Sequence, residues 1–300
     1  MRNDSSQQYV YSIVIPHKNN LSLLKRCVAS IPKDRMDVQV IIVDDFSRES
    51  ELPSKMQFDR PVDLFFLNEG ESKGAGRARN VGLSHAEGKW VLFADCDDYY
   101  EPDFLSVLDR YVESNRDMII FDAFWGKNLK TGTCWKSNLH KYIEEFEKNP
   151  KNVRNLIMMK HENNSCWNKM YSISYLKKIG AAFDETPSCN DAFFVQYASA
   201  NTWNVDAVNL KLYCYLSNQQ SITTTKQSIN ERMKKIKTVG RVHRYMQSVG
   251  AGIAIPSLKQ GLKTSVRRYG ILRTSVFILA NLYYGVPIYK RFLNCAKKWI

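Results

Sequence analysis

Three aspartates lie within four consecutive residues, Asp95-Cys96-Asp97-Asp98. Carboxylate oxygens are the hard ligands that Mg²⁺ and Mn²⁺ prefer, and such an ion often shares its coordination sphere with a diphosphate. A divalent cation there would neutralise the charge that accumulates on a departing phosphate. Taken alone, a short acidic motif is better explained as a solvated turn, because such motifs recur by chance. The surrounding elements therefore decide its meaning.

The hydrophobic pattern before this motif predicts alternating strands and helices. Residues 11–16 form a β-rich apolar run that ends at Pro16, and residues 38–43 form a second one that ends directly in Asp44 and Asp45. Between the two runs, apolar residues repeat at helical spacing. This order predicts a right-handed β-α-β crossover. Ligands of open α/β sheets bind beyond the carboxyl ends of the strands, where both aspartates fall.

The same alternation continues beyond the second strand and places the acidic motif at another strand end. We therefore predict an α/β fold with a mostly parallel central sheet flanked by helices. The further elements expected are strands at 62–67, 90–94 and 118–121, a helix from Gly74 to a cap at Gly88, and a helix from Pro102 to about residue 114.

Four sequence elements occur together and in order: Ile13-Val-Ile-Pro16, Val43-Asp-Asp-Phe-Ser47, Gly76-Arg-Ala-Arg-Asn80-Val-Gly82 and Phe93-Ala-Asp-Cys-Asp-Asp98. With them the chain resembles the family 2 glycosyltransferases. The resemblance implies a GT-A fold, a nucleotide diphosphate sugar as donor and inversion at the anomeric carbon. It extends over roughly residues 9–225. We therefore expect a catalytic domain at 1–225, with a nucleotide-sugar-binding half at 9–125 and an acceptor half at 126–225.

The resemblance assigns roles to the aspartates of these elements. Asp44 or Asp45 would read the base or ribose of the nucleotide, while Asp95 would lie near the ribose and the sugar. Asp97 would be the main ligand of Mn²⁺ or Mg²⁺. A different role for Asp44, as a helix cap, stays open.

Two more residues are assigned to the nucleotide sugar by the same resemblance. Pro16 would close the strand beside the nucleotide, and Arg79 would help to hold it. Arg79 could instead be a surface side chain. Phe46 and Cys96 replace the small residues usual at their places, and both would narrow the nucleotide pocket.

The acceptor half resembles the family through Trp167-Asn-Lys-Met-Tyr171 and Asn190-Asp191-Ala-Phe-Phe194. Asp191 would be the general base that takes the proton from the acceptor hydroxyl as it attacks the sugar. Asn190 stands where the family usually has Glu. Lys169 would orient phosphate or acceptor, although an exposed cation is an equally good interpretation.

Two absences indicate the type of transfer. No QxxRW sequence follows Asp191, and no uninterrupted apolar run of about 20 residues would span a bilayer. Processive synthases of the family carry both, so the chain resembles an enzyme that adds one sugar. Residues 220–223 resemble a segment of bacterial capsule and lipopolysaccharide transferases. We expect a UDP-sugar as donor and a glycan or lipid-linked glycan as acceptor.

The positive charge is concentrated at the carboxyl end of the chain. The net charge is +13, but residues 226–300 hold 16 Lys or Arg against one acid, Glu231, and the remainder holds 27 against 29. Such a segment can serve an anionic membrane, nucleic acid or an acidic partner. We expect a basic helical tail at 226–300.

An apolar stripe with cations along its edge runs through this tail. It predicts a helix lying in an anionic membrane surface, with a core-packed helix as the alternative. The stripe consists of Leu258, Leu262, Val266, Tyr269, Leu272 and Val276, edged by Lys259, Lys263 and Arg267.

The cellular setting follows from the cysteines and the first residues of the chain. Seven scattered cysteines without a CxxC pair suggest no disulfide framework or zinc site. The first apolar run is too short for a signal-peptide core. We therefore expect a cytoplasmic protein, peripheral at the inner face of the cell membrane.

Three other functions compete with a sugar transferase. A nucleic-acid-binding protein would use the basic tail, but no recognised binding module is present and the aspartate-rich loops would repel a phosphate backbone. A nucleotidyltransferase would usually carry a glycine-rich phosphate loop with a lysine, which Gly74-Ala-Gly76 lacks. An inactive scaffold of the same fold is the third, and the retained aspartates argue against it.

Overall fold

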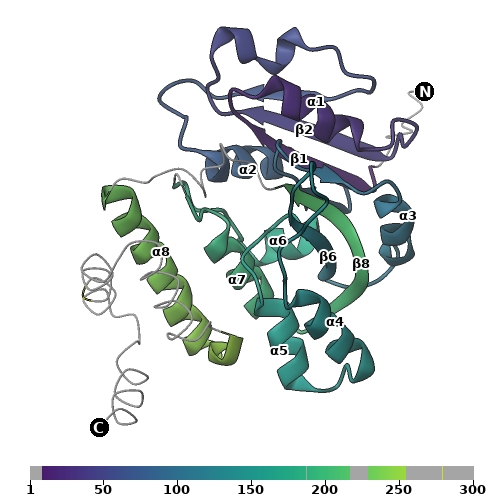
Figure 1. Ribbon diagram of the computed structural model, residues 1–300, viewed down its shortest axis with the longest axis vertical. Coiled ribbons are helices and arrows are strands. Elements are labelled where there is room, and N and C mark those ends of the chain that lie inside the picture. Colours follow the sequence, from purple (N-terminus) through teal and green to yellow (C-terminus); the bar gives the residue numbers. More distant parts are fainter. Residues whose placement is uncertain (1–8, 187, 217–228, 255–278, 280–300) are drawn as a thin grey trace, which may run out of the picture.

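The computed structural model describes residues 9–186, 188–216, 229–254 and 279. Its centre is a mixed sheet with the strand order β3-β2-β1-β4-β7-β6-β8-β5 (Figure 1). The strands are β1 Tyr11–His17, β2 Val38–Asp44, β3 Asp63–Phe66, β4 Trp90–Phe93, β5 Tyr99–Tyr100, β6 Met118–Lys127, β7 Lys169–Ser172 and β8 Val205–Leu216. The helices are α1 Leu21–Ala29, α2 Ala75–Ser84, α3 Phe104–Leu108, α4 Leu139–Lys148, α5 Val153–His161, α6 Ile173–Ile179, α7 Ala192–Ala200 and α8 Ile229–Ser248.

Most neighbouring strands are parallel. β1 is parallel to β2 and β4, β2 is parallel to β3, and β6 is parallel to β8. β7 runs antiparallel between β4 and β6, and β5 pairs antiparallel with β8. Every residue of β1 and β2 is buried, as expected for parallel strands covered on both faces. The predicted α/β fold with a mostly parallel sheet is confirmed.

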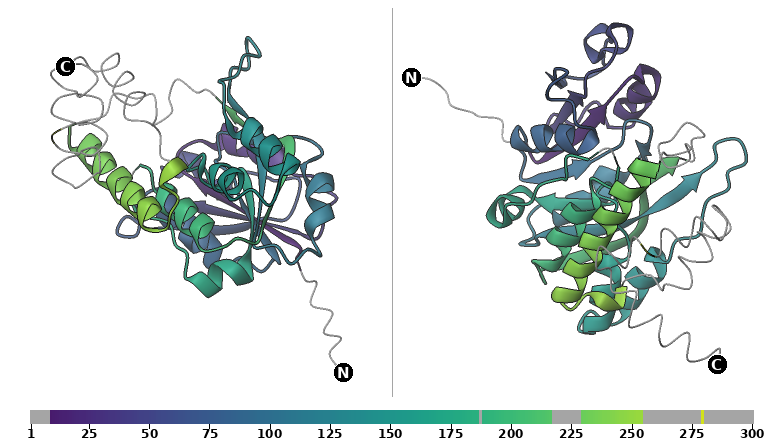
Figure 2. Two further views of the ribbon diagram at one scale, coloured as in Figure 1. Left: turned by 90° about the horizontal axis from the view of Figure 1, so that it is seen from below. Right: turned by 90° about the vertical axis from the view of Figure 1, so that its left-hand side faces the viewer.

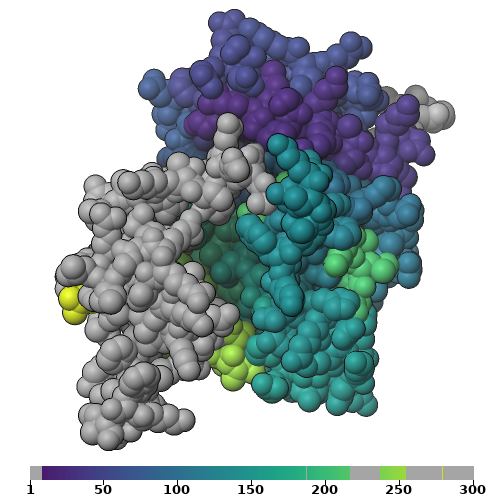
Figure 3. Space-filling view, viewed as in Figure 1, coloured from purple at the N-terminus to yellow at the C-terminus, as the bar shows by residue number. Residues whose placement is uncertain are grey.

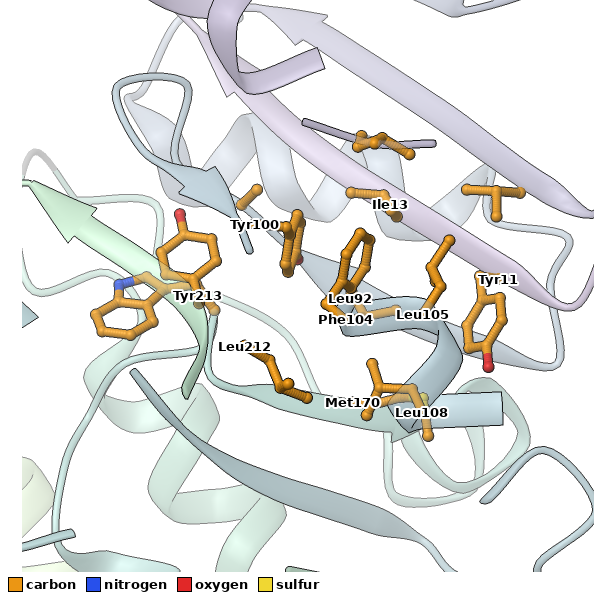
Figure 4. Close-up of a cluster of buried hydrophobic side chains, with 14 of the residues drawn as sticks. Tyr11, Ile13, Leu92, Tyr100, Phe104, Leu105, Leu108, Met170, Leu212 and Tyr213 are labelled. Atoms are coloured by element: carbon orange, nitrogen blue, oxygen red, sulfur yellow. The ribbon is translucent and has the colours of Figure 1, made fainter. Parts of the chain in front are cut away.

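Helices cover both faces of the sheet and form two apolar layers. Side chains of α1 and α3 pack with Ile13, Ile15 and Leu92 on one face. Side chains of α2, α4, α5, α6 and α7 pack with Val14 and Phe93 on the other. Alternate residues of one strand thus enter different layers, because successive side chains point to opposite faces. Figure 4 shows the first layer.

The elements differ in extent from their expected bounds. α2 ends at Ser84, so Gly88 does not cap it. Gly88 instead lets two chain segments approach: its amide donates to Ser12 Oγ at 2.9 Å, and a Cβ would lie 2.8 Å from the Ser12 amide nitrogen. The helix expected after Pro102 is shorter, because α3 passes into a 3₁₀ turn at Asp109–Tyr111.

The first helix of the basic segment 226–300 packs on α7. α8 lies beside α7 in Figure 1 and along the outside of the molecule in Figure 2. Val242 and Met246 of α8 are buried in a cluster with Ala192. Within the described residues, no helix has the length and apolar character needed to cross a membrane. The predicted stripe of residues 258–276 and the segment 220–223 lie outside the described residues.

The close approach at Gly88 yields a test of the fold. Gly88→Ala would place a Cβ 2.8 Å from backbone atoms of Tyr11 and Ser12 in the central strand β1, closer than a real contact allows. We expect the free energy of unfolding to fall by about 1–3 kcal/mol, the usual cost of overpacking. Urea denaturation measures it, with Gly70→Ala as control, where a Cβ would meet only Asn68 Oδ1 at 3.4 Å. Equal stability of the two variants would contradict this account.

Candidate active site

The acidic motif forms a cluster of carboxylates directly after β4. Oxygen atoms of Asp95, Asp97 and Asp98 all lie within 4.8 Å of one another. Burial and the charge of Asp95 raise the pKa of Asp97 to about 6. Burial and the charges of Asp97 and Asp95 raise the pKa of Asp98 well above its usual value. Carboxylates that repel one another at this range form a donor set that suits a hard divalent cation.

The three carboxylates are not equivalent. Asp98 is fully buried and accepts hydrogen bonds from the Tyr213 hydroxyl at 3.1 Å and the Leu216 amide at 2.8 Å, so it fastens the loop to β8. Asp97 is partly exposed, and its backbone carbonyl accepts a hydrogen bond from Arg26. Among the described side chains, none donates to the Asp97 carboxylate. Asp97 is therefore the carboxylate most available to a metal ion.

Tyr213 is a supporting residue that the sequence analysis missed. Its hydroxyl accepts a hydrogen bond from the Asp95 amide at 2.9 Å while it donates to Asp98. Figure 4 shows Tyr213 beside Tyr100 at one end of the apolar layer. The only signal in the sequence is that Tyr213 lies in a β-rich run, because nothing there pairs it with aspartates 115 residues away.

Arg79 on α2 connects this cluster with the residues just before α7. It is 4% exposed, so the alternative of a surface side chain is wrong. One guanidinium nitrogen donates to Asp95, and another donates to Asn190 Oδ1 at 2.7 Å. The guanidinium also lies over the Phe183 ring, 5.5 Å from its centroid. Its two terminal nitrogens thus bond to different parts of the site, whereas its buried Nε has no hydrogen-bond partner among the described residues.

Asp191 directly precedes α7 and is partly buried. Burial raises the pKa of its carboxyl to about 6, although the charge of Arg79 works in the opposite direction. The charge of Asp95 also raises the pKa of Asp191, and the charge of Lys169 lowers it. The structure therefore brings Asp95, Arg79 and Asp191 together, and a carboxylate poised near neutral pH suits a general base.

Asp44 and Asp45 follow β2 but have different surroundings. Asp44 accepts hydrogen bonds from His17 Nδ1 at 2.8 Å and from the amide and hydroxyl of Ser47 at 2.8 and 2.6 Å. Burial alone would raise the pKa of Asp44, but these bonds hold it below its usual value. Asp44 thus closes a turn, not a helix. Asp45 accepts weaker contacts from Lys18 and Gly74, at 3.3 Å each, and leaves more capacity for a ligand.

The loop after Asp45 holds an aromatic residue in an unusual conformation. Phe46 has a φ of +60°, a region that bulky residues rarely occupy, and its side chain is 48% exposed. The Ser47 hydrogen bonds to Asp44 hold this turn in place. Pro16, on the neighbouring strand, pairs in register with Val43 just before the two aspartates.

Lys169 is the first residue of β7, and its side chain is buried. It is 1% exposed, so the alternative of an exposed cation is wrong. Its Nζ donates to Asn163 Oδ1 at 3.0 Å, Ser165 O at 2.8 Å and Asn168 Oδ1 at 2.9 Å. Burial lowers its pKa to about 7. Its hydrogen bonds order the loop before β7. The charge of Asp191 opposes the effect of burial by raising the pKa of Lys169.

Comparison with known proteins identifies the family. The model of glycosyl transferase family 2 matches residues 12–180. The chain belongs to this family. The match includes the acidic cluster, Arg79 and Lys169, and ends before Asp191.

Curated relatives of this family member are bacterial glycosyltransferases. The putative glycosyltransferase EpsH of Bacillus subtilis is 26% identical over 70% of this chain and 62% of its own length. TarS of Staphylococcus aureus, a poly(ribitol-phosphate) β-N-acetylglucosaminyltransferase, is 24% identical over 70% of this chain and 36% of its own length. The chain thus spans less than two thirds of each of these relatives.

Solved structures share the fold. TarS in complex with UDP-GlcNAc superimposes with a TM-score of 0.61 at 21% identity, over 78% of this chain and 66% of that chain. The mannosyltransferase PcManGT of Pyrobaculum calidifontis, in complex with GDP-Man and Mn²⁺, gives 0.55 at 13% identity over 97% and 84%. The expected GT-A fold is confirmed.

The raised pKa of Asp191 yields a test that separates function from stability. Above pH ~6 Asp191 is ionised against the cost of burial, whereas below the unfolded value of 3.8 it is protonated in both states. Asp191→Asn should therefore raise the melting temperature at pH 8 and leave it unchanged near pH 4. Thermal unfolding across this pH range measures the effect.

The matched control for this test is Asp206→Asn. Asp206 is a partly exposed carboxylate near the start of β8, whereas the acidic cluster lies at the other end of that strand. The control should show no gain in melting temperature that grows between pH 4 and pH 8. If the melting temperature of Asp191→Asn did not rise at pH 8, burial would not destabilise the ionised Asp191 carboxylate as the structure indicates.

Proposed function

We propose that the protein is an inverting, non-processive glycosyltransferase that moves one sugar from a nucleotide diphosphate sugar to a glycan or lipid-linked glycan. The observation that carries this proposal is the placement of Asp191 beside Arg79 and Asp95, next to the acidic cluster. A candidate base and a candidate phosphate-side cation site thus lie together. Membership in family 2 supports the same reaction class.

Each residue has a defined task in the proposed transfer. Asp191 accepts the proton of the acceptor hydroxyl while that oxygen forms a bond to C1 of the sugar, and the bond from C1 to the phosphate oxygen breaks with its electron pair. Asp97, with Asp95 and Asp98 beside it, would hold Mn²⁺ or Mg²⁺, which when bound neutralises charge on the leaving diphosphate. Asp45 and Pro16 lie at the strand ends where the nucleotide would bind.

We assign a UDP-sugar as donor and place the reaction in surface polysaccharide biosynthesis. TarS has been solved with UDP-GlcNAc and bears the name of a poly(ribitol-phosphate) glycosyltransferase, which supports both assignments for this chain. PcManGT was solved with GDP-Man, so a GDP-sugar is the alternative donor to test. The absence of QxxRW after Asp191 favours single addition.

Metal dependence tests the proposed chemistry. Purified protein incubated with UDP- and GDP-sugars and Mn²⁺ should release nucleotide diphosphate from one donor, and EDTA should abolish the release. Asp97→Asn should lower the rate by roughly a hundredfold or more, because metal charge stabilisation contributes several kcal/mol. Asp103→Asn, at an exposed carboxylate just before α3, is the control and should keep the wild-type rate.

Two results would count against the enzyme. Silence across the donor panel, together with no donor binding by calorimetry, would favour an inactive scaffold of the same fold. Release of nucleotide diphosphate at the same rate with and without EDTA would overturn the metal site at Asp97.

We further propose that the basic tail rests on the anionic inner surface of the cell membrane, so that the enzyme is peripheral and faces the cytoplasm. The charge excess of residues 226–300 supports this location. Vesicles of phosphatidylglycerol and phosphatidylcholine should sediment the wild-type protein at low salt. The triple variant Lys259→Gln, Lys263→Gln, Arg267→Gln should bind on the order of a hundredfold more weakly, at about 1 kcal/mol per charge.

The control carries the same loss of charge outside the tail. Lys25→Gln, Lys177→Gln and Lys178→Gln remove three exposed lysines and should leave vesicle binding nearly unchanged. Equal weakening by both triple variants would show that net charge, not the tail, drives binding. Preference of the wild-type protein for DNA over vesicles at moderate salt would favour the nucleic-acid alternative.

A further inference from the structure

A row of aromatic side chains runs outward from the acidic cluster. Tyr213, whose hydroxyl contacts Asp98, stacks on Trp167 with ring centroids 4.7 Å apart. Trp167 stacks in turn on Tyr215 at 5.6 Å, and Tyr215 meets Trp135 edge-on at 5.7 Å. The inner two rings are buried, whereas Tyr215 is partly exposed and Trp135 is 54% exposed.

The exposed indole at the end of this row is held in place by the backbone. The Trp135 amide donates to the Trp125 carbonyl, and Gly126 of β6, which lies against the indole, has a φ of +58°. A Cβ at Gly126 would lie 2.2 Å from the Trp135 ring. A side chain at position 126 would therefore be both strained and in collision with the indole. The chain thus holds a large apolar ring against β6 although half of the ring faces water.

The row ends at the edge of the sheet where the candidate active site lies. Gly126 and Tyr215 belong to the carboxyl ends of β6 and β8, and these parallel strands end on the same side as β4. In the space-filling view, the teal part of the chain lies at the surface directly below the purple amino-terminal part (Figure 3). A second exposed indole, Trp203, is 61% exposed but precedes the start of β8, at the opposite edge.

We propose that Trp135, with Tyr215 beside it, is a stacking surface for a sugar ring of the acceptor glycan. This inference rests on the proposed transferase function and deepens it. A pyranose ring has an apolar face of C–H groups and a polar rim of hydroxyls, so it can cover an indole while its rim stays hydrated. An exposed aromatic ring at the same edge of the sheet as the candidate active site is the kind of patch that binds a ligand.

The position of Trp135 also limits the substrate class. We infer that the sugar stacked on Trp135 is not the one that receives the new bond, because Trp135 packs on Tyr215 and Gly126 and lies outside the acidic cluster of Asp95, Asp97 and Asp98. The acceptor is therefore an oligosaccharide or a polymer with sugars beyond its reactive end. A single sugar on a lipid would reach the acidic cluster without touching Trp135.

An array of bacterial surface oligosaccharides and polysaccharides printed on glass tests the inference. Wild-type protein should be retained by at least one glycan, and Trp135→Ala should bind it about tenfold more weakly, the usual loss for an aromatic anchor. Trp135→Phe should keep most of the binding because it keeps a ring. Trp203→Ala is the control, with an equally exposed indole at the wrong edge, and should bind like wild type.

The outcomes separate this inference from the proposed function. Nucleotide diphosphate release from the donor in the absence of any glycan should be unchanged in Trp135→Ala, since the indole does not touch the donor. Retention of no glycan by the wild type, or equal binding by Trp135→Ala, would overturn the stacking surface even if donors are cleaved. Glycan binding that depends on Trp135 without cleavage of any donor would overturn the transferase and leave the stacking surface standing.

Discussion

A buried guanidinium joins the parts of the candidate site. Removing an arginine charge from water costs several kcal/mol unless its hydrogen bonds are well satisfied. Arg79 offsets part of this cost through hydrogen bonds to Asp95 of the acidic cluster and to Asn190 before α7, and its charge lowers the pKa of the neighbouring Asp191. The donor side and the candidate base are therefore held at a fixed spacing by one side chain. Asn190 stands where the family usually has Glu and is a neutral partner. The charge of Arg79 therefore acts on Asp95 and Asp191.

The sequence predicted the parts of the site that depend on periodicity. β1, β2 and β4 are short apolar strands. They end at His17, directly after Pro16, at Asp44 and just before the acidic cluster, and parallel strands must place such ends at one edge of the sheet. The predicted roles of these residues stay predictions. The position of the acidic cluster directly after a strand was expected from the local sequence pattern, and the structure places it there after β4.

Long-range packing accounts for what the sequence could not provide. Gly88 resembles a helix cap in sequence, but only the structure shows that it accommodates the backbone of Ser12. Tyr213 and Asp98 form a pair across 115 positions, and no local pattern marks either as the partner of the other. Lys169 looks exposed as one cation in a polar segment, yet three acceptors in its own loop make its burial possible.

The first helix of the basic tail braces the loop that carries Asp191. Arg241 of α8 pairs with the Asp184 carboxylate and lies 4.0 Å from the centroid of the Phe193 ring. The Asp184 amide in turn donates to the Asn190 carbonyl at 3.0 Å, next to the candidate base. A division of the chain at residue 225 stays a prediction, but these contacts mean that α8 cannot leave without loosening the base loop.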